Sequence, residues 1–147
     1  MGSSSQSAID ASTGSFSIWH VLIIIMVLLF VLSPMLIGLM VMGAQRAVLL
    51  VHAGSGLSKN GYYGYSPTYF FFGFLVPIFR GEIGIGLLHL LFSALTFGIF
   101  QLVMPFLYNK QFTSRLLTTG WSIADPSSAR GVAATSRLGI IRGQAAA

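Results

Sequence analysis

Few side chains in this sequence could take part in acid–base chemistry. The acids are Asp10, Glu82 and Asp125, and the first and last of them lie in polar stretches near the two ends of the chain. Glu82 and His89 are seven residues apart, so on a helix they would share one face and could pass protons. Glu82 has a nearer partner in Arg80, however, and a histidine can bond a backbone carbonyl. We therefore favour a structural role for both residues and keep a proton or ion path as the alternative.

The sequence lacks the patterns of known enzyme and metal sites. It has no cysteine, no paired carboxylates and no HExxH or GxSxG motif. The histidines at 20, 52 and 89 fall in three different segments, without the spacing of metal ligands. The stretch Gly54-Ser55-Gly56 lacks the third glycine and the lysine of a phosphate-binding loop, so we interpret it as a turn. We expect no catalytic residues, no cofactor, no metal and no enzymatic activity.

The composition is that of a membrane protein. Hydrophobic residues make up 54% of the chain and charged residues 7%, whereas soluble domains contain about 25% charged residues. The uncharged apolar runs are 16–44, 67–79 and 83–108. A helix needs about 20 residues to cross about 30 Å of hydrocarbon, so the first and third runs are long enough. The 13-residue middle run is short, and it either crosses where the bilayer thins or dips in and returns.

Polar segments separate and flank these runs. Residues 1–15 are serine-rich and predict a disordered tail, and the glycines and β-branched residues of 45–66 predict a β-hairpin. Residues 80–82 form a short charged turn. An apolar stripe beside basic residues in 109–121 predicts an amphipathic extension at the membrane surface. The basic segment 122–147 is expected to be mostly disordered.

The distribution of lysine and arginine predicts how these segments are oriented. If 45–66 and the C-terminal tail are cytoplasmic, seven of the eight Lys and Arg lie inside and Arg80 alone lies outside. This arrangement satisfies the positive-inside rule, provided that all three runs cross and the N-terminus is outside. We therefore predict an all-α, multi-pass integral membrane protein with three transmembrane helices, the middle one short, and a small cytoplasmic β-hairpin between the first and second.

Several residues suit helix packing or anchoring at the membrane surface. Small residues let helix backbones approach closely, and a glutamine within lipid can bond a neighbouring helix. Aromatic and basic side chains suit the boundary between lipid and water. The packing candidates are Gly38, Ala94, Gly98 and Gln101. The surface anchors are Trp19, Tyr108, Lys110, Arg115 and Trp121.

Short motifs in the second half of the chain share an order and spacing with one family. These are Gly64-Tyr65-Ser66, Phe71-Phe72-Gly73-Phe74, Pro77-Ile78-Phe79-Arg80-Gly81-Glu82, Thr96-Phe97-Gly98-Ile99, Tyr108-Asn109-Lys110, Leu116-Leu117 and Gly120-Trp121. Over this stretch the chain resembles the HrgC-like family of small bacterial membrane proteins. The resemblance implies a β-hairpin before the aromatic-rich segment and a place in a bacterial inner membrane. It implies no reaction.

These features favour a non-enzymatic, oligomer-forming structural subunit of a bacterial inner-membrane assembly. Three thin helices bury little surface by themselves, so we expect further chains as partners, in a homo-oligomer or a larger complex. The other expected partners are the lipid bilayer and anionic lipids at the basic tail. We expect no nucleic acid, because the tail has no aromatic residue after Trp121. The alternative is a homo-oligomeric channel or small transporter, lined by the few polar residues of each chain.

Overall fold

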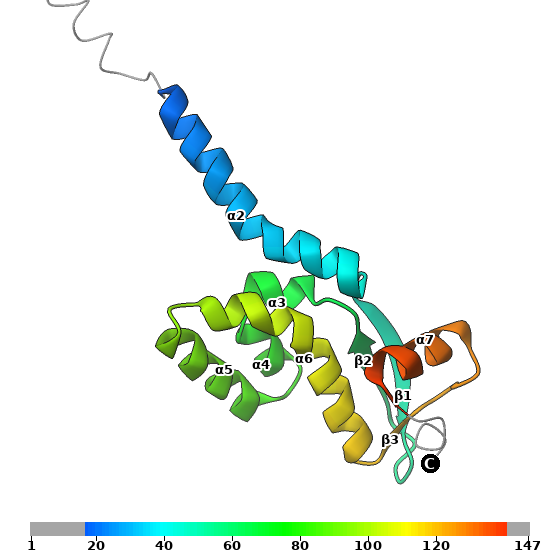
Figure 1. Ribbon diagram of the computed structural model, residues 1–147. Helices are drawn as coiled ribbons and strands as arrows, with labels where there is room; N and C mark the ends of the chain where they lie inside the picture. The colour runs from blue at the N-terminus through cyan, green and yellow to red at the C-terminus, as the bar shows by residue number, and fades with distance from the viewer. Residues whose placement is uncertain (1–16, 141–147) are drawn as a thin grey trace, which may run out of the picture. The chain divides into compact units, whose positions relative to one another are not determined.

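Figure 1 shows the computed structural model, which describes residues 17–140. The chain forms two compact units that divide between Pro34 and Met35. The tail expected at 1–15 and the last residues, 141–147, lie outside the described residues. Within the described part, the second unit holds every strand and every helix except the first part of α2.

Helix α2 (Ile18–Met42) begins in the first unit and ends in the second. Its 25 residues give a length of about 37 Å, which exceeds the roughly 30 Å thickness of bilayer hydrocarbon. It carries no Asp, Glu, Lys or Arg, and most of its large side chains are exposed, as far as 84% for Met40. Among the helices of residues 17–140, α2 is the one that is long and apolar enough to cross a membrane.

A three-stranded antiparallel sheet follows α2 along the chain. Its strands are β1 (Arg46–His52), β2 (Ser58–Tyr63) and β3 (Trp121–Ile123), in the spatial order β2-β1-β3. Strand β1 pairs with β2 in a hairpin and with β3 on its other edge. The hairpin lies within 45–66, where the glycine-rich pattern predicted one, whereas the third strand comes from the end of the chain.

Helix α7 (Ala129–Leu138) packs against this sheet. It begins where the Ser128 hydroxyl accepts a hydrogen bond from the N–H of Gly131, and it ends at Gly139, whose φ is 72°. Both are standard ways to satisfy the free backbone groups of helix ends. Sheet and helix together bury an apolar core: Val48, Leu50, Tyr63, Ile123, Ala134 and Leu138.

Four helices connect β2 to β3. They are α3 (Pro67–Phe72), α4 (Leu75–Phe79), α5 (Ile83–Leu95) and α6 (Ile99–Thr118). Helix α3 starts because the Ser66 hydroxyl accepts from the N–H of Tyr69, while Pro67 takes a position that needs no donor. Helices α3, α4 and α6 contribute a second core, formed by Tyr69, Val76, Met104, Tyr108 and Phe112.

The prediction of three membrane-crossing helices is wrong. Residues 17–140 form six helices and a three-stranded sheet, and α2 is the one candidate span among them. The run 67–79 is divided at Gly73, whose φ of 51° ends α3. The run 83–108 is divided at Thr96-Phe97-Gly98, where Phe97 and Gly98 have φ of 51° and 85°. Left-handed backbone cannot continue an α-helix, so neither run is one continuous rod.

The predicted membrane topology, which depended on three crossings, is not supported either. Residues 80–82, which the prediction put outside, lie beside residues that it put inside. The carboxylate of Glu82 is 2.7 Å from the guanidinium of Arg115, and the ammonium of Lys59 donates to the carbonyl of Arg80 at 3.5 Å. The turn between α4 and α5 therefore lies on the same side as the sheet and the end of α6.

Two further segments differ from the sequence analysis. The segment 109–121 was expected to lie on a membrane surface, but most of it is the second half of α6, which packs on β2 and buries Asn109, Phe112 and Thr113. The segment 122–147 was expected to be mostly disordered, but as far as residue 140 it contains the end of β3 and all of α7. Its small residues allow α7 to pack closely on the sheet.

Candidate functional site

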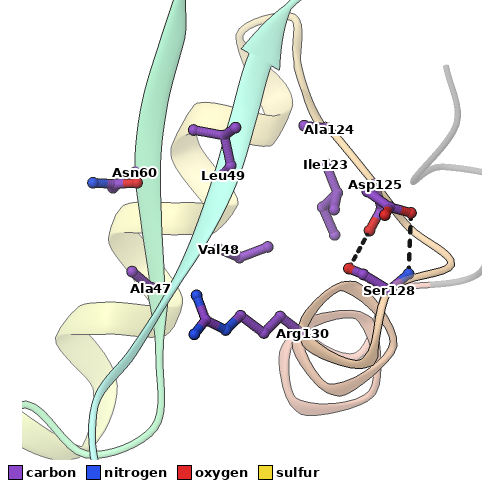
Figure 2. A pocket seen from close by; sticks show the side chains of 9 residues that line it. All are labelled: Ala47, Val48, Leu49, Asn60, Ile123, Ala124, Asp125, Ser128 and Arg130. Carbon is purple, nitrogen blue, oxygen red and sulfur yellow. Dashed lines mark hydrogen bonds between the residues drawn. The ribbon is translucent and has the colours of Figure 1, made fainter.

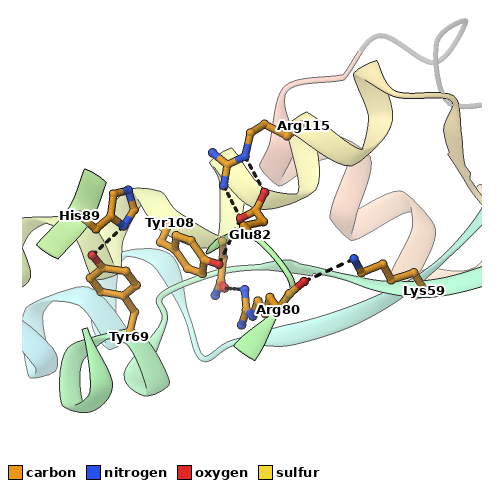
Figure 3. A network of polar contacts seen from close by, with 8 residues as sticks. Lys59, Tyr69, Arg80, Glu82, His89, Tyr108 and Arg115 are labelled. Atoms are coloured by element: carbon orange, nitrogen blue, oxygen red, sulfur yellow. Dashed lines mark hydrogen bonds and ion pairs between the residues drawn. The ribbon is translucent and has the colours of Figure 1, made fainter. Parts of the chain in front are cut away.

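A cluster of charged, polar and aromatic side chains lies where α4, α5 and α6 meet (Figure 3). We define the polar cluster as Arg80, Glu82, Tyr108, Asn109 and Arg115. The first two come from the turn between α4 and α5, and the other three from one face of α6. The turn is tight because Gly81 has a φ of 85° and because the N–H of Glu82 donates to the carbonyl of Pro77 at 2.8 Å.

Glu82 and Arg115 form the central ion pair of the cluster. The guanidinium Nε donates to Oε1 at 2.8 Å and Nη2 donates to Oε2 at 2.7 Å, so the pair is bidentate. The Tyr108 hydroxyl adds a longer hydrogen bond of 3.4 Å to Oε2. The side chain of Glu82 is 19% exposed and that of Arg115 is 34% exposed. Glu82 was expected to pair with Arg80, its neighbour along the chain, but its ion-pair partner is Arg115.

Arg80 is held by aromatic rings instead. Its guanidinium carbon lies 4.1 Å from the ring centroid of Tyr62, 5.0 Å from that of Tyr108 and 4.9 Å from that of Phe112. Such distances are typical of cation–π contacts. Its Nη1 donates to Oδ1 of Asn109 at 3.2 Å. Burial lowers the pKa of Arg80, while the nearby Tyr108, Tyr62 and Glu82 oppose this shift.

Asn109 is fully buried and connects four parts of the second unit. While its Oδ1 accepts from Arg80, its Nδ2 donates to Oε1 of Gln45 and to the carbonyl of Gly64, each at 3.2 Å. The same Gln45 oxygen accepts from Ser66 at 3.1 Å. The amide thus bonds the α4–α5 turn, the connection before β1 and the end of the β-hairpin to α6. A buried amide with all of these partners satisfied fixes one arrangement of elements.

His89 lies next to this cluster and not within it. Its Nδ1 is 2.9 Å from the Tyr69 hydroxyl, and its ring centroid is 6.0 Å from that of Tyr108. Glu82 contacts the same tyrosine through its hydroxyl. In the described part of the chain no hydrogen bond joins Glu82 to His89, so the two residues of the proposed proton path lie on either side of Tyr108.

A cavity of about 220 Å³ opens beside the sheet, away from the polar cluster. Figure 2 shows the Arg130 side chain extending into it toward Ala47 and Asn60. The carboxylate of Asp125, on its rim, accepts hydrogen bonds from the hydroxyl and N–H of Ser127 and from the N–H of Ser128. These bonds lower the pKa of Asp125. The cavity is therefore lined by one cation, Arg130, and by one carboxylate, Asp125, whose hydrogen bonds already go to Ser127 and Ser128.

Metal coordination finds no support in the described residues. Within 17–140 no group of three His, Asp or Glu side chains is arranged to hold a metal ion. His52 packs edge to face on Trp121, with ring centroids 5.3 Å apart, and its Nδ1 is 3.1 Å from the Ser55 hydroxyl.

The residues singled out for packing and anchoring have varied surroundings. A Cβ at Gly38 would overlap the ring of Tyr65, so the glycine allows this ring, in the same unit, to pack against the backbone of α2. Gln101 Nε2 donates to the carbonyl of Phe70 in α3 at 3.3 Å. Gly98 caps α6, and the exposed Ala94 lies near the end of α5. Trp19, at the start of α2, and Lys110 are exposed, whereas Tyr108 and Arg115 belong to the polar cluster and Trp121 to the sheet.

Sequence reasoning missed Asn109 and Thr113, which lie one helical turn apart. The Thr113 hydroxyl both donates to the carbonyl and accepts from the N–H of Tyr62, each at 2.7 Å. The signal was present, because two polar residues four apart beside the apolar Tyr108 and Phe112 occupy one helix face. The prediction placed the whole segment 109–121 at the membrane surface, which hid this contact with β2.

The geometry shows a closed structural cluster with its polar groups bonded to one another. Comparison with protein-family models, with curated proteins and with solved structures finds no match to this chain.

Proposed function

We propose that this protein is a non-enzymatic, membrane-anchored structural subunit of a bacterial inner-membrane assembly, held in the bilayer by α2. The observation that carries the proposal is α2 itself, a 25-residue helix without a charged side chain. A helix that is apolar on all sides needs lipid or other helices around it. Within α2, which is wholly described, Gly38 is the one buried residue.

The charge distribution supports one crossing better than three. All eight Lys and Arg follow α2, and the residues before it contain none. A single crossing at α2 therefore places every basic residue on one side, which the positive-inside rule identifies as the cytoplasm. The N-terminus is then outside and the second unit is cytoplasmic. The three-crossing arrangement left Arg80 on the wrong side.

Basic residues also lie next to the end of α2. Arg46 is exposed and follows Met42 by four residues, and Nη1 of Arg137 donates to the Met42 carbonyl at 3.0 Å. A cation at a helix C-terminus is favourable, because the last carbonyls carry partial negative charge. Exposed arginines close to the lipid surface attract anionic headgroups. These contacts support anionic lipids as partners of the second unit.

The polar cluster supports a structural role over an enzymatic one. Its ion pair and its buried amide are bonded to one another and to the backbone. General acid–base or nucleophilic work requires a group that can reach a substrate. Groups already paired within the fold serve to hold the α4–α5 turn on α6. The resemblance to the HrgC-like family is consistent with this proposal, since it implies a location and no reaction.

Cysteine scanning along α2 tests both the anchor and the assembly. The natural chain has no cysteine, so single substitutions from Leu22 to Phe30 can be oxidised in native membranes without background. A subunit that pairs through α2 gives cross-linked dimers with the helical period of 3.6 residues, whereas Ser55→Cys, in the exposed β1–β2 turn, gives none. Mild-detergent purification should also yield discrete oligomers or co-purifying chains. A strict monomer in lipid, with no partner, would contradict the proposal.

A further inference from the structure

We propose that α5 and the first half of α6 form a hairpin that enters the lipid and returns to the same face, with Phe97 at its tip. This inference rests on the proposed anchoring by α2. It concerns the segment from Ile83 to Pro105, and both of its ends lie beside the polar cluster. In Figure 1 this hairpin extends from the end of the second unit that is opposite to the sheet and α7.

The hairpin exposes far more apolar surface than a water-facing unit normally does. The run from Ile83 to Tyr108 contains no charged residue. Within α5, which is wholly described, only Gly86 and His89 are buried. Large exposed apolar patches indicate contact with a membrane or a protein. The side chains that form the patch are Leu87, Leu91, Leu95, Phe97, Ile99 and Val103.

The backbone N–H groups at the tip of the hairpin do not depend on water for their hydrogen bonds. All six N–H groups from Thr96 to Gln101 donate hydrogen bonds within the hairpin. Five of these go to backbone carbonyls, and that of Phe100 goes to the Thr96 hydroxyl, which itself donates to the carbonyl of Phe92 at 2.7 Å. Irregular backbone is excluded from hydrocarbon when its polar groups are unpaired. A turn exposed to water has no need of such complete pairing.

Phe97 is the second indication that the tip meets lipid. Its side chain is 97% exposed, and its φ of 51° lies in a region that bulky residues rarely adopt. Strained backbone persists where surrounding structure or function requires it. Here the strain directs the largest apolar side chain of the turn away from the protein, which is favourable only if an apolar solvent receives it.

The length of the hairpin explains why it returns. The 13 residues of α5 measure about 20 Å, which is less than the roughly 30 Å of hydrocarbon but enough to reach its middle. The depth of the hairpin's base in the membrane follows from contacts with the end of α2. The ring of Tyr65 lies against Gly38 in the last turns of α2, and its centroid is 5.1 Å from that of Phe106 in α6. Phe106, two residues before Tyr108, therefore lies at the depth of the cytoplasmic end of the anchor.

Depth measurements on the full chain test this proposal. Phe97→Cys, Leu29→Cys in α2 and Ser55→Cys in the β1–β2 turn are each labelled with an environment-sensitive fluorophore. The proteins are reconstituted in phosphatidylethanolamine and phosphatidylglycerol vesicles. Quenchers are nitroxides fixed near the ends of the acyl chains or a water-soluble ion. We expect the labels at 97 and 29 to be quenched several-fold more by the acyl-chain nitroxide than by the ion, and the label at 55 to show the reverse.

The outcomes separate this inference from the anchor on which it rests. Water quenching at 97 with lipid quenching at 29 overturns the hairpin and leaves the anchor intact. Water quenching at 29 overturns the anchor. A label at 97 that neither quencher reaches lies in a protein interface, which also overturns insertion into lipid. As a matched pair, Phe97→Gly relieves the strained φ and Phe97→Asp adds a charge. With the label moved to Leu95→Cys, only the aspartate should move that label toward water.

Discussion

The chain contains two long uncharged runs, 16–44 and 83–108, and the structure treats them differently. The first forms one continuous helix, α2, whose described part starts at Ile18. The second forms α5 and the first half of α6, joined by a turn. Both runs are uncharged and longer than 20 residues, so length and the absence of charge do not explain why one is continuous and the other is divided. Local backbone geometry and the partners of the flanking residues distinguish them.

The residues that break helices are not the ones usually suspected. Pro34 lies inside α2 and Pro105 lies inside α6, and both helices continue through them. The second run is divided instead at Thr96-Phe97-Gly98. There the Thr96 hydroxyl accepts from the N–H of Phe100, in the first turn of α6, at 3.1 Å. A proline removes one donor from a helix, whereas two left-handed residues reverse the direction of the chain.

The flanking residues complete the difference. Both ends of the second run carry polar side chains that bond each other, through Glu82 with Arg115 and Arg80 with Asn109. Around the first run the basic residues are distributed differently, since every Lys and Arg of the sequence follows it. An ion pair that joins the two ends of an apolar run requires both ends to lie in one compartment.

The largest expected effect is therefore an all-or-none result in topology. Gly81→Cys, Ser55→Cys and Ser127→Cys should all react with a membrane-impermeant maleimide from the cytoplasmic side only. The left-handed backbone at Gly81 costs a cysteine about 1–2 kcal/mol, which leaves the fold in place. Labelling of position 81 from the opposite side would make the second run a crossing helix like the first. It would also require the Glu82–Arg115 pair to be absent in the membrane.

The sequence predicted local features better than the long-range ones. The β-hairpin within 45–66 and the apolar first helix follow from glycine turns and hydropathy. The pairing of β3 with β1 did not follow, since it joins Trp121 to His52, which lie far apart in the sequence. Three residues such as Trp121–Ile123 carry no periodicity that distinguishes a strand from a loop.

The site was harder to predict for a related reason. Its residues were visible, but Glu82 was paired by sequence distance with Arg80, and the actual partner, Arg115, is 33 residues away. Gly98 was interpreted as a packing position in a continuous helix, because a glycine in an apolar run allows either packing or a left-handed turn. The interpretation of 83–108 as a crossing segment then excluded any contact between its two ends.

Removing the side chain of Asn109 should be the most damaging single change to the fold. Asn109→Ala leaves the partly buried Gly64 carbonyl without this donor and Arg80 without this acceptor, which should cost about 2–3 kcal/mol. The matched control is Asn60→Ala, in β2, where the side chain is exposed and the change should stay within about 0.5 kcal/mol. Denaturant unfolding in detergent measures both. Equal stabilities would show that the base of the hairpin is not fixed by this amide.

Two glycines of α5, two residues apart and so on opposite sides of the helix, test how the hairpin packs on α4. A Cβ at Gly86 would overlap Ile78 and lie 3.1 Å from the carbonyl of Phe74, so Gly86→Ala should lose about 1–3 kcal/mol. In the described part of the chain nothing lies within 4 Å of a Cβ at Gly84. Gly84→Ala should therefore gain as much as about 1 kcal/mol from helix propensity. The same unfolding assay applies, and a loss at both positions would mean that α5 is covered on its outer side as well.

The smallest effect concerns how the end of α2 is held. Asp125 caps the turn before α7, and α7 provides the Arg137 bond to the Met42 carbonyl. Hydrogen bonds from Ser127 and Ser128 lower the pKa of Asp125 below its ordinary value of 3.8.

A lowered pKa means that this contribution to stability is complete above about pH 4 and is lost as the pH falls through the folded-state pKa. Acid affects other parts of the chain as well, so the informative quantity is the difference between the unsubstituted chain and Asp125→Asn, whose amide does not titrate. That difference in unfolding midpoint should be constant above about pH 4 and shrink below it. Ser127→Ala removes one donor, so the pKa of Asp125 is lowered less and the total loss of stability in acid should be smaller. If the natural chain and Asp125→Asn instead decline in parallel, the capping carboxylate does not stabilise α7 and the end of the anchor is held by the sheet alone.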